Sequence, residues 1–197
     1  MHITYNAPVV LTFSLLAATL MLLGTFTSNV ITEKFFAVYP TIDWKNPVDW
    51  FQLVSHVLGH SDWGHLFGNL TFLLLLGPAL EEKYGSVNLL EMILLTAVVT
   101  GLVTVFLFSS GLLGASGIVF MFILLSSYAN AQEGEIPLTF VLIAFLFIGK
   151  ELLSAFSHDD ISQMAHIVGG LCGGIFGFAR SKSKDSSGLS EGTEEIC

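Results

Sequence analysis

Long hydrophobic stretches alternate with short polar ones along the chain, and this pattern predicts membrane-crossing helices. About 20 apolar residues are enough to cross a hydrocarbon core of about 30 Å, and shorter stretches do so where the bilayer thins. Six stretches qualify, at residues 8–26, 65–80, 87–108, 116–131, 136–153 and 161–178. The pattern therefore predicts an all-α polytopic membrane protein, a bundle of six transmembrane helices.

The stretches at 65–80 and 116–131 are short for spanning segments and carry polar groups. Polar groups at membrane depth are stable only where protein or water satisfies them, so we expect both helices to end in a water-filled cavity. The stretch at 8–26 has no basic lead-in and no small-residue cleavage site. We expect it to be a retained helix, not a removed signal peptide.

The polar segments set the predicted domain organisation. The long segment 27–64 holds all three tryptophans. Indole rings favour the headgroup level, so we expect this segment to be a long interfacial loop between the first two helices. The last segment, 181–197, is rich in Lys, Ser, Gly and Glu and cannot bury a core. A membrane domain at 1–180 and a disordered cytoplasmic tail at 181–197 are predicted.

The composition agrees with a membrane setting and excludes one class of partner. The chain is 53% hydrophobic and 12% charged, whereas soluble domains carry about 25% charged residues. Its net charge of −9 removes the basic surface that a nucleic-acid partner requires. The two cysteines, Cys172 and Cys197, have no spacing for a disulfide framework or a zinc knuckle.

Basic residues indicate the orientation in the membrane. Six crossings place both termini on one side. With cytoplasmic termini, the inner segments hold Lys83, Arg180, Lys182 and Lys184, and the outer ones hold Lys34, Lys45 and Lys150. Charges close to the end of a span weigh most, and the cluster after the sixth stretch therefore favours cytoplasmic termini.

A serine between glycines opens the fourth stretch, in the tetrad Gly114-Ala115-Ser116-Gly117. Ionisable and strongly polar groups in a span are expensive, which makes each of them a functional candidate. One interpretation of Ser116 is a helix N-cap, a common role for serine. The other is a nucleophile, and the tetrad alone does not decide between them.

A histidine in the sixth stretch lies on a face rich in glycine. Gly169, Gly170 and Gly173 follow His166 at three, four and seven residues, and allow another helix to approach closely. His166 is then able to reach that helix directly. The alternative is a structural histidine hydrogen-bonded between helices, with the glycines serving packing only.

Polar residues gather at the start of the second stretch, where His56, His60, His65 and Asn69 occur. His65 and Asn69 are four residues apart and share one helical face. Histidines at such spacings can bind zinc, but no H-E-x-x-H pattern is present, and Asp62 is better interpreted as a helix boundary. We expect no metal, and propose instead that His65 and Asn69 donate hydrogen bonds to an oxyanion.

Together these motifs resemble those of the rhomboid family of intramembrane serine proteases. H-x-x-x-N matches His65 and Asn69, G-x-S-G matches 114–117, and A-H-x-x-G-x-x-x-G matches 165–173, in family order. E-x-x-x-G-S matches 81–86, and His56 and His60 fall at further matching positions. Two departures stand out. The family's Trp-Arg is Trp50-Phe51, which leaves the seating of the loop open, and an aromatic that is often tyrosine is Phe120.

The resemblance implies the roles of these residues. Ser116 is the nucleophile and His166 the general base, a dyad in which Phe120 packs on His166. The Ser116 backbone N–H, His65 and Asn69 stabilise the oxyanion, and no cofactor is involved. Gly114, Gly117, Gly169, Gly170, Gly173, His56 and His60 are supporting residues.

The resemblance also implies the setting and the substrates. Transmembrane proteins in the lipid bilayer are cut in or beside a helix, and a loop at 155–162 caps the site. His158, Asp159 and Asp160 in this loop are expected to be solvated charges. A multi-pass protein of the plasma membrane is predicted.

Two alternative functions remain at this point. One is a catalytically silent rhomboid-like protein that binds membrane clients, although such proteins typically lack the serine or the histidine. The other is a rhomboid-type enzyme dedicated to a sorting signal of exported proteins. The oligomeric state is open.

Overall fold

The regular structure is helical throughout the parts of the chain that the computed structural model describes, residues 2, 4–128, 136–154 and 160–188. The helices are α1 (Pro8–Phe26), α2 (Val30–Phe35), α3 (Pro47–Ser55), η1 (His56–Leu58), α4 (Trp63–Tyr84), α5 (Ser86–Leu107), α6 (Ser116–Tyr128), α7 (Leu138–Ser154) and α8 (Asp160–Gly188). The predicted all-α fold is confirmed for these residues.

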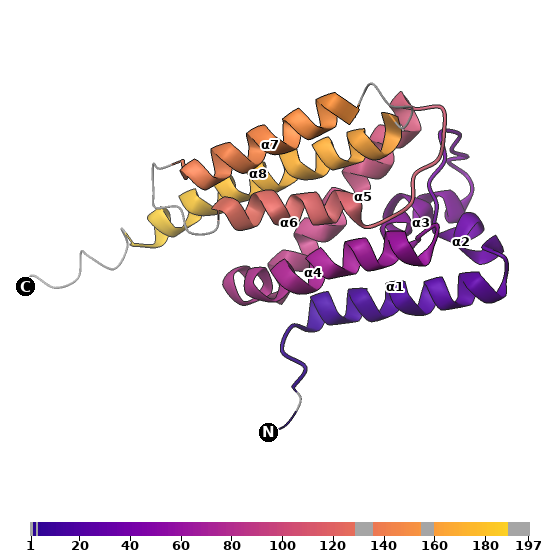
Figure 1. Ribbon diagram of the computed structural model, residues 1–197, viewed down its shortest axis with the longest axis horizontal. Coiled ribbons are helices and arrows are strands. Elements are labelled where there is room, and N and C mark those ends of the chain that lie inside the picture. Colours follow the sequence, from indigo (N-terminus) through magenta and orange to yellow (C-terminus); the bar gives the residue numbers. More distant parts are fainter. Residues whose placement is uncertain (1, 3, 129–135, 155–159, 189–197) are drawn as a thin grey trace, which may run out of the picture.

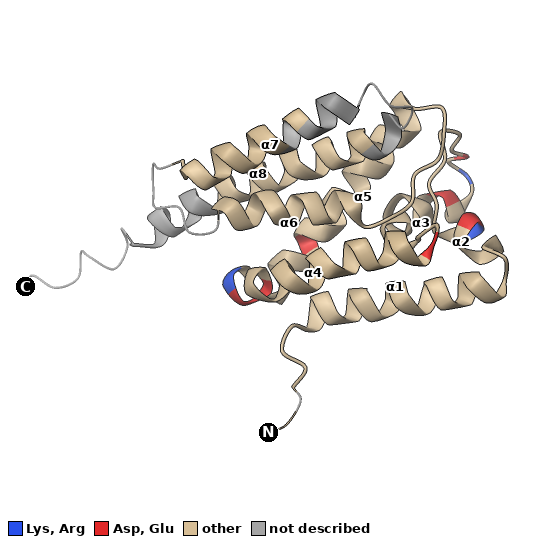
Figure 2. Ribbon diagram, viewed as in Figure 1, with Lys and Arg blue, Asp and Glu red and all other residues tan. Residues whose placement is uncertain are grey.

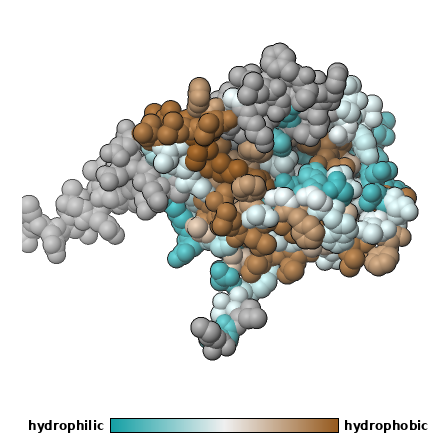
Figure 3. All heavy atoms as spheres, viewed as in Figure 1, coloured by the Kyte–Doolittle hydropathy of each residue, from teal (hydrophilic) through white to brown (hydrophobic). Residues whose placement is uncertain are grey.

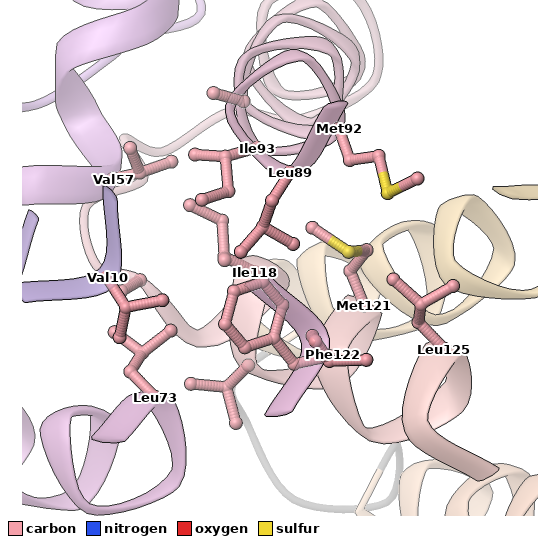
Figure 4. Close-up of a cluster of buried hydrophobic side chains, with 14 of the residues drawn as sticks. Val10, Val57, Leu73, Leu89, Met92, Ile93, Ile118, Met121, Phe122 and Leu125 are labelled. Atoms are coloured by element: carbon pink, nitrogen blue, oxygen red, sulfur yellow. The ribbon is translucent and has the colours of Figure 1, made fainter. Parts of the chain in front are cut away.

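The long helices form a bundle around α6. In Figure 1, α1, α4, α6 and α8 lie side by side in that order, α7 lies along α8, and α5 passes behind α6. Met121, Phe122 and Leu125 of α6 are fully buried. Figure 4 shows them among side chains from neighbouring helices, such as Val10 of α1 and Leu89 of α5. Helix α6 is therefore held by helices on several sides.

Among the described residues, α1, α4 and α5 are long and apolar enough to cross a membrane. The prediction of a short fourth stretch is confirmed, since α6 has 13 residues. A further short apolar helix covers Gln163–Ala179, within α8. Three of the six predicted spans are thus supported by length and composition, and the count of six stays a prediction.

The prediction that the second span is short is wrong, because α4 has 22 residues. The helix starts at Trp63, where the Asp62 carboxylate accepts a hydrogen bond from the His65 N–H at 2.9 Å. It continues through the polar residues after Leu80 and ends at Gly85, which has a φ of +80°. Hydropathy marks only the apolar part of a helix, whereas capping residues set its ends.

Helices α6 and α8 pack with their backbones in contact. A Cβ atom added to Gly169 would collide with the Gly117 carbonyl, and one added to Gly173 would collide with the Met121 carbonyl. Only residues without a side chain fit on this row of α8, as is typical of closely packed membrane helices. Gly170 is also buried, but the α6 backbone lies against Gly169 and Gly173.

The start of α1 is fixed by Glu81, a buried carboxylate near the end of α4. Its two oxygens accept hydrogen bonds from the Val9 and Val10 N–H groups at 2.9 and 3.0 Å. The Ser86 hydroxyl donates to the same carboxylate at 2.7 Å. The first N–H groups of a helix have no partner within the helix, and Glu81 satisfies two of them. Its negative charge also interacts favourably with the positive end of the α1 dipole.

The outer surface of the bundle is apolar over its middle. Large apolar side chains such as Leu15, Leu75, Leu95 and Phe145 are exposed on α1, α4, α5 and α7. Figure 3 shows hydrophobic residues over the long helices, and hydrophilic ones gathered where α2 and α3 lie. In Figure 2 the charged residues lie mostly toward the ends of the bundle. Such a distribution is typical of a surface that faces lipid.

The segment 27–64 contains α2, α3 and η1 and is therefore partly helical. Trp44 packs edge-on against Trp50 with ring centres 5.1 Å apart, and about half of each side chain is exposed. The position of the segment 27–64 at the membrane interface stays a prediction.

Parts of the predicted cap loop and tail lie outside the described residues. These parts are 155–159, with His158 and Asp159, and 189–197, with Cys197. Helix α8 begins at Asp160 and runs to Gly188, so it overlaps the segment predicted as a tail. The domain boundary at 180 stays a prediction.

Candidate active site

Ser116 occupies the first turn of α6. The Ala115 carbonyl accepts the Val119 N–H at 2.9 Å, so Ala115 and not Ser116 holds the N-cap position. The loop that leads to Ser116 is fixed by two backbone hydrogen bonds between Val38 and Leu112, of 2.9 and 2.8 Å. Ser116 is half-buried. Its hydroxyl group is thus carried by a constrained backbone at the positive end of a helix dipole.

Gly114, in this loop, lies against His65 at the start of α4. Its φ of +123° is unfavourable for any residue with a side chain. A Cβ atom there would lie 2.7 Å from the Cε1 and Nε2 atoms of His65, and the Gly114 N–H donates to the His56 carbonyl at 2.9 Å. The structure therefore brings His56 and His65 to the loop that carries Ser116.

His166 lies on the turn of α8 that faces the start of α6. A Cβ atom on Gly117 would be 3.2 Å from the carbonyl oxygen of Ala165, the residue before His166. The ring of Phe120 lies 4.3 Å from the His166 ring, centre to centre, at an angle of 38°. The expected packing of Phe120 on the half-buried His166 is present.

Asn69 is buried on α4 and hydrogen-bonded to His60. The Nδ1 atom of His60 lies 3.2 Å from the Leu58 carbonyl, which fixes Nδ1 as the donor. The Nε2 atom is then free to accept the Asn69 amide N–H at 3.0 Å. Burial is the main cause that lowers the pKa of His60 to about 4, and the nearby His65 adds to it. His60 is consequently neutral at physiological pH.

A family model described as "Rhomboid domain" matches residues 47–183. The chain belongs to the rhomboid family. Ser116, His166, His65 and Asn69 lie inside the matched range, whereas Val38 and α1 precede it.

Three relatives show the extent of the similarity. The chain is 26% identical over 152 residues to the Rhomboid protease GlpG of Haemophilus influenzae, covering 76% of this chain and 79% of that protein. It is 27% identical over 154 residues to the chloroplastic Rhomboid-like protein 11 of Arabidopsis thaliana, covering 70% and 55%. It is 27% identical over 136 residues to the Putative rhomboid protease YdcA of Bacillus subtilis, covering 64% and 65%. Family membership and the apolar helices make this rhomboid an integral membrane protein.

His56 and Thr100 support the site of this rhomboid, and the sequence analysis did not single out Thr100. His56 Nδ1 lies 3.1 Å from the Gln52 carbonyl, and its Nε2 lies 3.3 Å from the Thr100 hydroxyl of α5. Burial lowers the pKa of His56 to about 4. A signal for Thr100 was available, because Thr96, Thr100 and Thr104 recur every four residues in an apolar stretch, which predicts a buried polar row.

In the described part of the chain, no three His, Cys, Asp or Glu residues lie close enough together to hold an ion. The rings of His60 and His65 are 5.0 Å apart. Asn69 already occupies the Nε2 atom of His60. The side chains of His60 and Asn69 therefore hold each other in place.

Proposed function

We propose that this rhomboid is an intramembrane serine endopeptidase whose nucleophile is Ser116 and whose general base is His166. The observation that carries the proposal is the close contact of α6 and α8, in which Gly117 lies against Ala165 and Gly169. This contact sets the residues next to Gly117 and Ala165 on facing turns. The names of two relatives, a rhomboid protease and a putative one, agree with proteolysis.

The proposed reaction follows from these positions. The Ser116 Oγ attacks the carbonyl carbon of a peptide bond while His166 takes the hydroxyl proton. The C–N bond then breaks, and His166 donates that proton to the leaving amine. A water molecule, deprotonated by His166, then attacks the acyl carbon. The ester C–O bond breaks, and His166 returns the proton to the Ser116 Oγ.

Donors at the start of α6 and α4 would stabilise the negative charge of the tetrahedral intermediates. The N–H groups in the first turn of α6 have no partner within the helix and lie at its positive end. His65, in contact with the serine loop at Gly114, and Asn69 would add side-chain donors. Transmembrane segments of other membrane proteins are the proposed substrates.

The proposed setting is the plasma membrane. All six predicted spans cross it, both termini are cytoplasmic, and residues 181–197 form a tail. The chain carries both the serine and the histidine, which favours an enzyme over a silent client-binding protein.

Cleavage of a transmembrane substrate tests the function. Purified protein in liposomes is mixed with candidate transmembrane substrates, and the fragments are sequenced. We expect cleavage by the wild type and by Ser109→Ala, an exposed serine of the loop before α6, and none by Ser116→Ala. Binding of the substrates by the wild type without any cleavage would support the silent client-binding alternative.

Labelling with a fluorophosphonate tests the dyad itself. The probe should label Ser116, because His166 removes the hydroxyl proton. Labelling should vanish in Ser116→Ala and fall strongly in His166→Ala, as measured by in-gel fluorescence. Labelling of His166→Ala at the wild-type rate would show that another group activates the serine.

A further inference from the structure

A groove of about 600 Å³ runs between α1, α3 and α5, away from the serine loop. Its walls are almost entirely carbon, and its residues include Phe13, Leu16, Phe51, Val54, Ile93 and Leu94. The polar residues that line it have partners of their own. The Ser55 hydroxyl donates to the Phe35 carbonyl at 2.6 Å, and the Ser86 hydroxyl donates to Glu81 at 2.7 Å. The groove therefore offers a ligand apolar contact only.

The groove exists because α3 lies between α1 and α5. Gly101 of α5 allows the α3 backbone to approach, since a Cβ atom there would lie 2.8 Å from the Leu53 carbonyl oxygen. Gln52 also fastens α3 to the end of α2, donating to the Lys34 carbonyl at 2.9 Å. The groove residues of α1, and those of α5 except Ala97, come from the first halves of these helices. The two helices are thus separated there by a space that no described side chain fills.

The groove is continuous with the surface that faces lipid. Leu16, Leu90 and Leu94 line it and are 49%, 44% and 42% exposed. They belong to α1 and α5, which are long and apolar enough to span the membrane. No charged side chain of the described residues lines the groove. Its opening is therefore surrounded by the hydrocarbon chains of the bilayer and not by water.

We propose that this groove is a binding site for one acyl chain of a bilayer phospholipid, which seats α3 against α1 and α5. Water has no polar partners there, and an empty space of this size would forfeit the dispersion contacts of all its walls. An acyl chain is flexible, linear and abundant at the opening, and fills the space with apolar contact. The proposal requires only that the protein is in a membrane, and holds whether or not the protein is a protease.

Phe51 makes the end of the groove at α3 apolar in this chain. It stands where the family pattern has arginine, it is half exposed, and it lines the end of the groove formed by α3. Its ring packs edge-on against Phe36 with centres 5.8 Å apart. In the proposed complex, the end of the acyl chain contacts Phe51 and Val54. Apolar contact with lipid then holds α3 in place, since the arginine of the family pattern is absent.

Photo-crosslinking in vesicles tests the proposal. The full chain is reconstituted in phosphatidylcholine and phosphatidylglycerol vesicles that contain a phospholipid with a diazirine at the end of one acyl chain. After illumination, labelled peptides are mapped by mass spectrometry. We expect labelling of α3 at Phe51 and Val54 and of α5 at Leu90 and Leu94 to exceed severalfold that of Leu75 on α4, which is 69% exposed and outside the groove.

Two matched variants on α5 separate a site from general lipid contact. Leu94→Trp fills the opening of the groove and should reduce labelling of α3 severalfold. Leu95→Trp places the same ring on the adjacent, exposed position outside the groove, and should leave labelling unchanged. Leu90→Trp provides a second groove-filling variant if the first does not fold, as judged by its melting temperature.

Two results would overturn the proposal. Labelling that follows exposure alone, and is equal in Leu94→Trp and Leu95→Trp, would show ordinary annular lipid. Displacement of the lipid label from α3 by an added transmembrane peptide would show that the groove binds polypeptide instead.

Discussion

A single hydrogen bond orients the side chain of Asn69, and its direction is set by a carbonyl two residues before His60. Because His60 donates from Nδ1 to Leu58, its Nε2 atom is an acceptor and takes one N–H of the Asn69 amide. The amide carries two N–H donors, so one remains for another acceptor. His60 is a positioning residue for Asn69.

Removal of the Asn69 amide should slow catalysis without disabling the nucleophile. Loss of one oxyanion donor typically costs about 2.7 to 4 kcal/mol, or roughly 10² to 10³ in kcat. Asn69→Ala should therefore show a reduced kcat with little change in KM, measured by steady-state cleavage of a transmembrane substrate in liposomes. Fluorophosphonate labelling of Ser116 serves as the control and should persist. An increase in KM at unchanged kcat would assign Asn69 to substrate binding or packing.

The two buried histidines should make the fold sensitive to acid. Burial lowers the pKa of His56 and His60 from 6.5 to about 4. On unfolding, the ordinary pKa returns, so the unfolded chain binds more protons between these values. The contribution of the two histidines to the free energy of unfolding is therefore fully present above about pH 6.5. It is lost as the pH drops toward about 4, by up to about 3 kcal/mol for each histidine.

Thermal unfolding in detergent at a series of pH values measures this loss. The double variant His56→Gln and His60→Gln should have a lower melting temperature at neutral pH but a flatter pH profile. An equally steep profile in the double variant would mean that other groups cause the acid sensitivity.

At the scale of elements, the backbone contact of α6 with α8 makes one added methyl group costly. A Cβ atom at Gly169 collides with the Gly117 carbonyl, so Gly169→Ala must push the helices apart. We expect a loss of about 1 to 3 kcal/mol in stability. Proteolysis should fall by about 10²-fold if Ser116 and His166 are displaced by about 1 Å.

Gly174→Ala is the matched control on the same helix. A Cβ atom there meets the Phe140 ring at 3.8 Å, which is ordinary contact. Melting temperature and substrate cleavage are compared for the two variants. Equal effects of both alanines would show that the α6–α8 contact has no special part in activity.

The elements also show what the sequence can and cannot predict. Helices α1 and α5 begin and end within one residue of the predictions, because each apolar run fills its helix. The predicted length of α4 is too short, because Asp62 and Gly85 set the ends of the helix outside the apolar run. The motifs predicted a shared site for His56, His65 and the serine loop, but periodicity does not encode pairings between distant residues, such as that of His56 with Thr100.

At the scale of the whole molecule, the predicted orientation can be tested with two lysines. Lys45 precedes α3 and Lys83 lies near the end of α4, and both are exposed. With six crossings and cytoplasmic termini, Lys45 faces outward and Lys83 inward. In a background with Cys172→Ser and Cys197→Ser, an impermeant maleimide should label Lys45→Cys on intact cells, and Lys83→Cys only after permeabilisation. The reverse pattern would show the opposite orientation, and labelling of both on intact cells would contradict the six-span arrangement.

The carboxylate of Glu81 also imposes an order of assembly on the growing chain. It binds N–H groups of Val9 and Val10, which lie 72 and 71 residues earlier. Synthesis proceeds from the N-terminus, so α1 enters the bilayer long before its partner exists. Its mean hydropathy of 2.2 allows it to span the bilayer alone in that interval, with water at the membrane surface satisfying the two N–H groups. Only when α4 has been made can Glu81 replace this water, so α1 is fastened to α4 after both helices exist.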